Sequence, residues 1–375
     1  MSQIDQRVTL KINRPRNPAL AFGAVLFLIF CILAEAVART PFVQARVAYQ
    51  AYGTNHTQLE LQLNNLERFV EKNGAPDCFV FGSSQAFREI DPRIFALAFQ
   101  HARGESLTCY NFGVTGSQIW TTSILGEILI AKYQPRLVVI GTSFLDYTEG
   151  REFQIDERFK ENDWLEFQTS KFTLGGWLTE HSYAWRALTL LSYAAPYGMR
   201  YEEVLREAHK WDGEIADSGF ALSEESVDPS VPVEPGFVKN LQLEFGGFGV
   251  SERNLSALEE TVAFSQEAGT QVLLAEMTYH PSLLELKDPK GSPRANKEQI
   301  LAFIQKVNAR LEGIASKRGI VFLEFDPALS LPETVWFDLY HLNRVGAAIF
   351  SRWLGEQAAQ VIGPLPPVRA ANEGE

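Results

Sequence analysis

The stretch that decides the fold is CFVFGSSQAF, residues Cys78 to Phe87. Its first half is almost entirely apolar, which is typical of a strand covered on both faces of a sheet. The strand ends abruptly at Gly82, and two adjacent hydroxyl side chains, Ser83 and Ser84, follow in the turn. On these residues alone, the serines either cap the next helix or supply a nucleophile. The rest of the sequence has to separate these two interpretations.

The composition is that of a globular protein, with 46% hydrophobic and 21% charged residues in 375. The formal net charge of −12 argues against nucleic-acid binding, which requires a basic face to neutralise phosphates. None of the cysteines Cys31, Cys78 and Cys109 shows CxxC spacing, so no zinc site is indicated and no metal or cofactor is expected. Buried free thiols are favoured at Cys78 and Cys109, and a bridge between them stays open if their strands are neighbours.

The N-terminal segment departs from the globular pattern. Residues 18–34 carry no charge, Glu35 closes the apolar run, and the basic residues just before it are Lys11, Arg14 and Arg16. We expect residues 18–38 to form a transmembrane signal anchor, with residues 1–17 in the cytoplasm and the rest of the chain outside it, in the periplasm or at the cell surface. The alternative is a signal peptide cleaved after 36–38. The run exceeds the usual signal core of about 7–15 residues, which favours the anchor.

Strands alternate with helices through most of the remaining chain. The predicted strands are 77–84, 106–113, 136–143, 270–281 and 319–325, and the predicted helices are 91–102, 117–133, 251–269, 295–317 and 343–360. This alternation predicts an α/β fold with a five-stranded parallel sheet and helices on both faces, spanning 75–362. A helical insertion is expected at 145–250, a helical connector at 41–74 and a disordered tail at 363–375.

In a sheet of this kind, functional groups gather at the carboxyl ends of the strands. The predicted ends carry serines, glycines, an aspartate and two histidines, which are the groups that a serine acyl-transfer site requires. Asp338 and His341 are close enough for one turn to place the carboxylate against the imidazole and set its tautomer. Alternatively, Asp338 and Asn343 are turn and cap residues and His341 is incidental. The short motif does not decide between these on its own.

A serine after the glycine of the first strand, combined with Asp338-x-x-His341 before the C-terminal helix, resembles the SGNH (GDSL-type) hydrolase superfamily. The resemblance implies a flavodoxin-like three-layer αβα sandwich. It also implies that Ser84 is the nucleophile, that His341 is the general base and that Asp338 orients it. The backbone N–H groups of Ser84 and Gly116 would then donate to the oxyanion.

The resemblance covers about residues 75–150 and 250–360, and it is imperfect in one block. Where the family carries Gly-x-Asn-Asp, this sequence has Gly-Thr-Ser-Phe, which places Ser143 at the position of the asparagine. Ser143 is therefore a provisional third oxyanion donor. Asp146 is a second polar group on the same loop, with no role in the motif, and is a candidate for a substrate contact. His280 after the fourth strand is another candidate, with a structural role as the alternative, because a histidine before a proline in a loop is more often structural.

The predicted anchor and the Gly-Ser-Ser sequence narrow the resemblance to extracytoplasmic SGNH proteins that modify bacterial envelope glycans, such as those of alginate O-acetylation and teichoic acid D-alanylation. This resemblance implies cleavage or transfer of an acyl ester through an acyl-Ser84 intermediate, on an envelope or exported polysaccharide. The implied partners are the membrane and a membrane-bound acyltransferase. The alternative is a weakly active or inactive binding or assembly protein on the same fold, within a glycan-export or modification complex.

Overall fold

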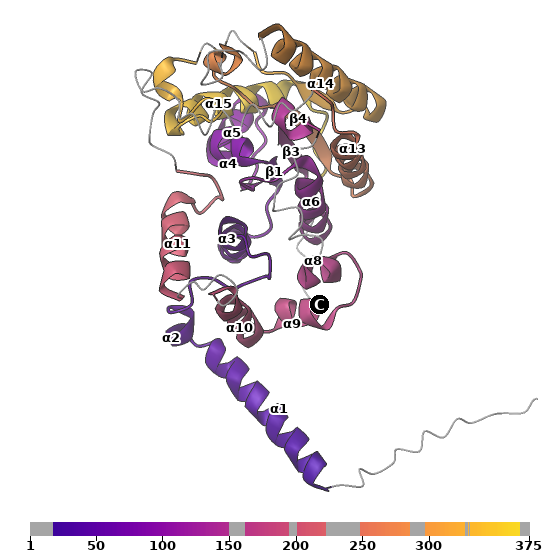
Figure 1. The fold of residues 1–375 in the computed structure, drawn as a ribbon. Coiled ribbons are helices and arrows are strands. Elements are labelled where there is room, and N and C mark those ends of the chain that lie inside the picture. The colour runs from indigo at the N-terminus through magenta and orange to yellow at the C-terminus, as the bar shows by residue number, and fades with distance from the viewer. Residues whose placement is uncertain are drawn as a thin grey trace, which may run out of the picture.

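The computed structural model describes residues 18–149, 162–194, 201–222, 248–285, 297–326, 329 and 331–367. Its centre is a five-stranded parallel sheet in the order β2-β1-β3-β4-β5 (Figure 1). The strands are β1 Cys78–Gly82, β2 Cys109–Gly113, β3 Leu137–Thr142, β4 Gln271–Glu276 and β5 Val321–Leu323. This is the flavodoxin-like order, whose switch point lies between β1 and β3. The predicted α/β fold with a five-stranded parallel sheet is confirmed.

Helices cover both faces of the sheet because its strands alternate their side chains between two apolar clusters. Phe79 and Phe81 of β1 pack on one side, whereas Cys78 and Val80 pack on the other. The first face is covered by α3 Thr57–Asn73, α6 Ile119–Tyr133, α13 Glu252–Glu267 and α14 Lys297–Arg318. The second face is covered by α5 Pro92–Arg103 and α15 Arg344–Val361.

Helix α3 differs from its prediction as part of a connector over 41–74. Leu59 and Leu66 are almost completely buried and belong to the same apolar cluster as Phe79 of the sheet. After the short helix α2 Pro41–Gln44, this segment is therefore built into the sandwich instead of only linking it to the N-terminal helix. Its amphipathic pattern is that of any surface helix, so the sequence could not distinguish the two arrangements.

Helix α1, Pro18–Ala38, projects away from the rest of the protein (Figure 1). It has 21 residues, a mean hydropathy of 2.6 in its most apolar window, and none of that window is buried. By length and composition the helix can cross a membrane. It matches the predicted span of 18–38, whereas 1–17 and most of the predicted tail, 363–375, lie outside the described residues.

Within the region predicted as a helical insertion, 145–250, the described residues form helices and two isolated β-bridges, Thr148 with Val250 and Ile215 with Ala221. Its helices are α8 Asp163–Gln168, α9 Leu174–His181, α10 Tyr183–Ala194 and α11 Tyr201–Glu214, preceded by the 3-10 turn η1 Phe144–Tyr147. Trp164 joins the main core, and Val204 and Ala208 of α11 pack in a third cluster with Leu61 of α3. The insertion is thus packed onto the sandwich through α3.

Cys78 and Cys109 lie on neighbouring strands, which a disulfide bridge between them would require. Cys78 and Cys109 are register partners on β1 and β2, and both are buried free thiols. Burial raises the pKa of the Cys109 thiol well above its usual value, and the adjacent Cys78 adds to the shift. The prediction of buried free thiols is confirmed.

Candidate active site

The candidate nucleophile lies where β1 meets a short helix that the sequence did not predict, α4 Ser84–Glu89. Ser83 is the N-cap and Ser84 the first helical residue. Gly82 has φ +152°, and a β-carbon there would lie 2.5 Å from the carbonyl oxygen of Gly141. At the end of β2, a β-carbon on Gly113 would lie 2.5 Å from the backbone nitrogen of Phe87. The absence of side chains at these strand ends lets α4 lie directly on the sheet.

Asp338 and His341 lie in a closed loop between the 3-10 turn η4, Glu333–Val335, and α15. Trp336 and Leu342 form an isolated antiparallel bridge across the loop, and the backbone N–H of Phe337 donates to His341 O at 2.8 Å. These bonds hold the loop in a tight turn, so the two side chains are presented together at the end of the sheet.

Three side chains form a hydrogen-bonded chain in this loop and α4. Asp338 Oδ2 lies 2.7 Å from His341 Nδ1, and His341 Nε2 lies 2.8 Å from Ser84 Oγ. The other carboxylate oxygen, Asp338 Oδ1, accepts the backbone N–H groups of Tyr340 and His341, each at 2.9 Å. The structure thus brings together the three residues that the sequence singled out as nucleophile, base and orienting carboxylate.

The charge of Asp338 suits this arrangement. Burial disfavours the carboxylate, but the neighbouring His341 charge and the hydrogen bonds to His341 and Tyr340 outweigh it and lower the pKa of Asp338. An ionised Asp338 accepts a proton-bearing Nδ1, which leaves Nε2 of His341 as the acceptor that faces Ser84. Ser84 itself is only partly buried, so its hydroxyl is accessible while His341 is enclosed.

Two backbone N–H groups at this end of the sheet are free to donate. Among the described residues, neither the N–H of Ser84, at the start of α4, nor that of Gly116 has a hydrogen-bond partner. The loop that carries Gly116 is held beside the end of β1, because Val114 N donates to Gly82 O at 3.0 Å. Gly116 is exposed and has φ +72°. These are the two predicted main-chain oxyanion donors, and that role stays a prediction.

The loop after β3 differs from what the sequence suggested. Ser143 Oγ accepts the N–H of Leu145 at 3.1 Å, and Asp146 Oδ2 accepts the N–H of Ser143 at 2.9 Å. Both residues are buried and together form a capping box at the start of η1. Asp146 therefore has a structural role in this loop, and its contact with a substrate and the donor role of Ser143 stay predictions.

The side chain of His280 has hydrogen-bond partners within the protein. Its Nε2 lies 2.6 Å from Glu333 Oε2, its Nδ1 accepts the N–H of Ser282 at 3.1 Å, and its side chain is 7% exposed. Its backbone N–H donates to Leu339 O at 2.8 Å, inside the loop that carries His341. His280 thus connects the end of β4 to that loop, as the structural alternative requires, and its contact with a substrate stays a prediction.

A buried polar cluster that the sequence analysis missed lies directly behind Ser84. The amide Nε2 of Gln85 donates to Thr278 O at 2.7 Å and to Tyr340 O at 2.9 Å. On the next turn of α4, Glu89 Oε2 accepts from Thr278 N at 3.0 Å and from Thr278 Oγ1 at 2.9 Å. Gln85 therefore links the helix that carries Ser84 to the loop that carries His341. The available signal was the i, i+4 spacing of Gln85 and Glu89, which places both side chains on one face of a helix.

The carboxyl group of Glu89 differs electrostatically from that of Asp338. Burial raises the pKa of Glu89 well above its usual value, the bonds from Thr278 oppose the shift, and the nearby charge of Asp338 adds to it. Burial and the charge of Asp338 thus both favour the protonated form of Glu89, whereas the pKa of Asp338, which faces His341, is shifted in the opposite direction.

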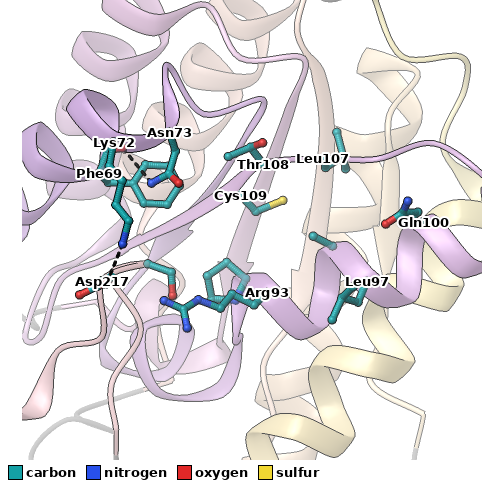
Figure 2. Close-up of a pocket in the computed structure, with 13 residues that line it drawn as sticks. Phe69, Lys72, Asn73, Arg93, Leu97, Gln100, Leu107, Thr108, Cys109 and Asp217 are labelled. Carbon is teal, nitrogen blue, oxygen red and sulfur yellow. Dashed lines mark hydrogen bonds and ion pairs between the residues drawn. The ribbon is translucent and has the colours of Figure 1, made fainter.

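A separate pocket of about 470 Å³ lies beside the outer edge of β2, between α3 and α5 (Figure 2). Figure 2 shows Lys72 paired with Asp217 at its rim, at 3.7 Å, and the Cys109 side chain among its lining residues. None of its lining residues is Ser84, Asp338 or His341. Within the described residues, no group of three or more His, Cys, Asp or Glu side chains is placed to hold a metal ion.

Comparisons with known proteins give structural likenesses only. No family model and no curated protein matches the sequence. The fold is similar to that of a lipase/acylhydrolase from Enterococcus faecalis, with 12% identity, a TM-score of 0.33 and coverage of 78% of this chain and 99% of that one. It is also similar to a GDSL-like lipase from Bacteroides thetaiotaomicron, with 12% identity, a TM-score of 0.34 and coverage of 79% and 97%. The fold class rests on the strand order of this chain, and the candidate site on its own hydrogen bonds.

Proposed function

We propose that the protein is a membrane-anchored, extracytoplasmic serine esterase or O-acyltransferase that acts through an acyl-Ser84 intermediate. The observation that carries this proposal is the continuous chain of hydrogen bonds from Asp338 through His341 to Ser84. Such a chain makes a weak hydroxyl nucleophile reactive, because the imidazole removes its proton as it attacks.

The proposed reaction follows from these positions. His341 Nε2 takes the proton of Ser84 Oγ as this oxygen bonds to the carbonyl carbon of an ester. The negative charge that develops on the carbonyl oxygen is stabilised by the N–H groups of Ser84 and Gly116. The intermediate collapses, the bond to the leaving alcohol breaks, and His341 returns the proton to that alcohol. Asp338 keeps Nδ1 protonated and stabilises the imidazolium throughout.

The second half of the reaction decides between hydrolysis and transfer. His341 deprotonates an incoming hydroxyl, which attacks the acyl carbon and releases Ser84 with its proton restored. Water as the incoming group makes the protein an esterase, whereas a sugar hydroxyl makes it an O-acyltransferase. The resemblance to envelope-modifying SGNH proteins supports a polysaccharide as the acyl donor or acceptor, with a membrane-bound acyltransferase as partner.

The anchor in this proposal is α1. Its length and composition support a membrane span, and the basic residues before it support a cytoplasmic N-terminus with the sheet on the other side. On this orientation, Ser84 acts outside the cytoplasm, where envelope and exported glycans are found.

One observation favours a second candidate, a non-catalytic binding or assembly protein on the same fold. Ser143 takes the position of the family asparagine, and its hydroxyl accepts a hydrogen bond from the backbone of its own loop. Removing one oxyanion donor from an active hydrolase costs about 10²–10³ in rate, so a missing donor would leave a weak site.

A fluorophosphonate probe, which forms a covalent bond with an activated serine, separates the two candidates. The full-length protein in detergent should be labelled, and Ser84→Ala should abolish the labelling. Ser83→Ala is the matched control, because the Ser83 side chain makes no cap hydrogen bond. Absence of labelling of the wild type between pH 6 and 9 would support the non-catalytic candidate, and equal loss in both variants would remove Ser84 from its proposed role.

A further inference from the structure

Helices α9 and α10 expose an unusual number of large apolar side chains. The exposed residues on these helices and in the turn before α9 are Phe172, Leu174, Trp177, Trp185, Leu188 and Leu191, which we call the apolar base. Their spacing of three residues along each helix puts them on one face of that helix. Contiguous exposed apolar surface on a folded domain marks a site of interaction with a protein or a membrane.

The apolar base is attached directly to the end of α1. The Glu35 carboxylate accepts the hydroxyl of Ser182 at 2.7 Å and the backbone N–H groups of Tyr183 and Ala184, both at 3.1 Å. Arg39 donates to His181 O at 3.2 Å. The junction between α9 and α10 is thus fixed to the last turns of α1. In Figure 1, both helices lie at the end of the domain from which α1 leaves.

These helices are also held firmly to the sandwich. Arg186 of α10, only 4% exposed, pairs with Glu67 of α3 at 3.5 Å and donates to Thr179 O at 2.6 Å. Further along α10, Tyr193 donates its hydroxyl to the buried Glu60 of α3 at 2.9 Å. The exposed faces therefore keep their orientation relative to α1 and cannot turn inward without breaking buried polar contacts.

We infer that the apolar base lies in the interfacial layer of the same membrane that α1 crosses, with Trp177 and Trp185 at the level of the lipid headgroups. The inference rests on the anchoring role of α1 in the proposed function. Tryptophan side chains are enriched at membrane interfaces because the ring is apolar and its N–H needs a polar partner. The bilayer is the occupant favoured here, because α1 carries exposed Leu33 and Val37 in the same turns from which Glu35 and Arg39 bind the junction of α9 and α10.

The arrangement would hold the catalytic domain at a set height and orientation. Helix α3 lies between α10 and the sheet, so the apolar base and the strands are on opposite sides of α3 (Figure 1). The protein would then rest on the membrane through two elements, α1 and the apolar base, instead of swinging on a single helix.

The test uses the full chain in lipid nanodiscs, with a fluorescent label at one introduced cysteine. Cys31 is replaced by serine, and the same protein without an introduced cysteine measures the background labelling of the buried thiols Cys78 and Cys109. Leu188→Cys and, as a second position, Leu191→Cys report on the apolar base. Leu97→Cys on α5 is the matched control, since Leu97 is 58% exposed and Leu188 is 60% exposed. Leu26→Cys reports on α1 itself.

Spin-labelled lipids should quench the labels at 188, 191 and 26, whereas aqueous iodide should quench only the label at 97. Iodide quenching at 188 and 191 equal to that at 97, with lipid quenching at 26, overturns the inference and leaves the anchor intact. Lack of lipid quenching at 26 overturns the anchor and the inference with it. Protection at 188 and 191 in native membranes but not in nanodiscs also overturns it, in favour of a protein occupant.

Discussion

The loops that follow β1 and β3 have similar sequences, but their serine side chains have different hydrogen-bond partners. Both strands finish with a glycine and two hydroxyl residues, and the strands are direct neighbours in the sheet. Ser84 Oγ lies 2.8 Å from His341 Nε2, whereas Ser143 Oγ accepts the N–H of Leu145. Ser84 is the first residue of its helix, while Ser143 is itself the cap. The Ser143 hydroxyl thus accepts a bond from its own loop, whereas the Ser84 hydroxyl, one position after the cap of its helix, faces an imidazole.

The largest expected effect is at Asp338, which orients His341 toward Ser84 in the loop after β1. Asp338→Asn should lower the rate of fluorophosphonate labelling by about 10⁴-fold, because an amide can present its N–H₂ to Nδ1 and stabilise the wrong tautomer of His341. Stopped-time labelling followed by mass spectrometry measures the rate. Asp91→Asn is the control, since asparagine caps α5 as well as aspartate does. A loss of less than tenfold would contradict the role of Asp338.

The same substitution has a consequence for stability that depends on pH. The folded pKa of Asp338 is lowered, so its carboxylate stabilises the fold above the unfolded pKa of about 3.9 and loses this contribution as the pH falls through the folded pKa. The difference in unfolding free energy between wild type and Asp338→Asn should therefore shrink as the pH is lowered below 4. Urea titrations at several pH values measure it, and a difference that grows on acidification would contradict the sign.

An intermediate effect is expected at Gln85, the residue that links the helix of Ser84 to the loop of His341. Gln85→Leu removes the donor to Tyr340 O and Thr278 O, so His341 should shift relative to Ser84 and the labelling rate should fall by up to about 10²-fold. The acid limb of the pH–rate profile should also move, which a purely structural loss would not cause.

Gln62→Leu provides the matched control for this change. Gln62 is as buried as Gln85, and its amide donates to Gly219 O at 2.7 Å and to Gly113 O at 3.4 Å but not to the loop of His341. Both variants should lose about 1–3 kcal/mol of stability by leaving carbonyl groups unpaired. Equal labelling rates in the two variants would show that Gln85 does not position the site.

The smallest effect on activity is expected at Ser143, where the comparison of the two loops is most direct. Ser143→Ala should cost about 1 kcal/mol of stability through the lost cap and change the labelling rate by less than threefold. Urea midpoints and labelling rates measured on the same preparation report both quantities. A loss of 10²–10³ in rate would instead identify Ser143 as an oxyanion donor.

Much of the site was predictable because its residues follow strand ends. Ser84 comes directly after an apolar strand, and Asp338 and His341 lie in one short loop before a helix, so local sequence carried the information. The capping box of Ser143 and Asp146 also has a local signature, the Ser-x-x-Asp pattern, whereas the resemblance to the family motif implies an oxyanion donor at Ser143.

Other features were hidden because their partners are backbone groups far along the chain. Gln85 binds the carbonyls of Thr278 and Tyr340, which no side-chain pattern reveals. Helix α4 was missed because a six-residue helix is too short to show a period. The place of α3 within the sandwich was missed because it precedes the first strand and resembles a linker in pattern.

The glycines beneath α4 have a consequence for mutational scanning. Because a β-carbon at Gly82 or Gly113 would collide with the backbone of β3 or α4, alanine at either position raises or tilts the helix that carries Ser84. A scan that scores only activity would rank these glycines with Ser84 and His341, although neither glycine has a side chain to take part in the reaction. Positions that a scan finds essential at this end of the sheet are therefore of two kinds. Some carry side chains that take part in the reaction, and others must lack a side chain so that α4 holds Ser84 at the correct distance from His341.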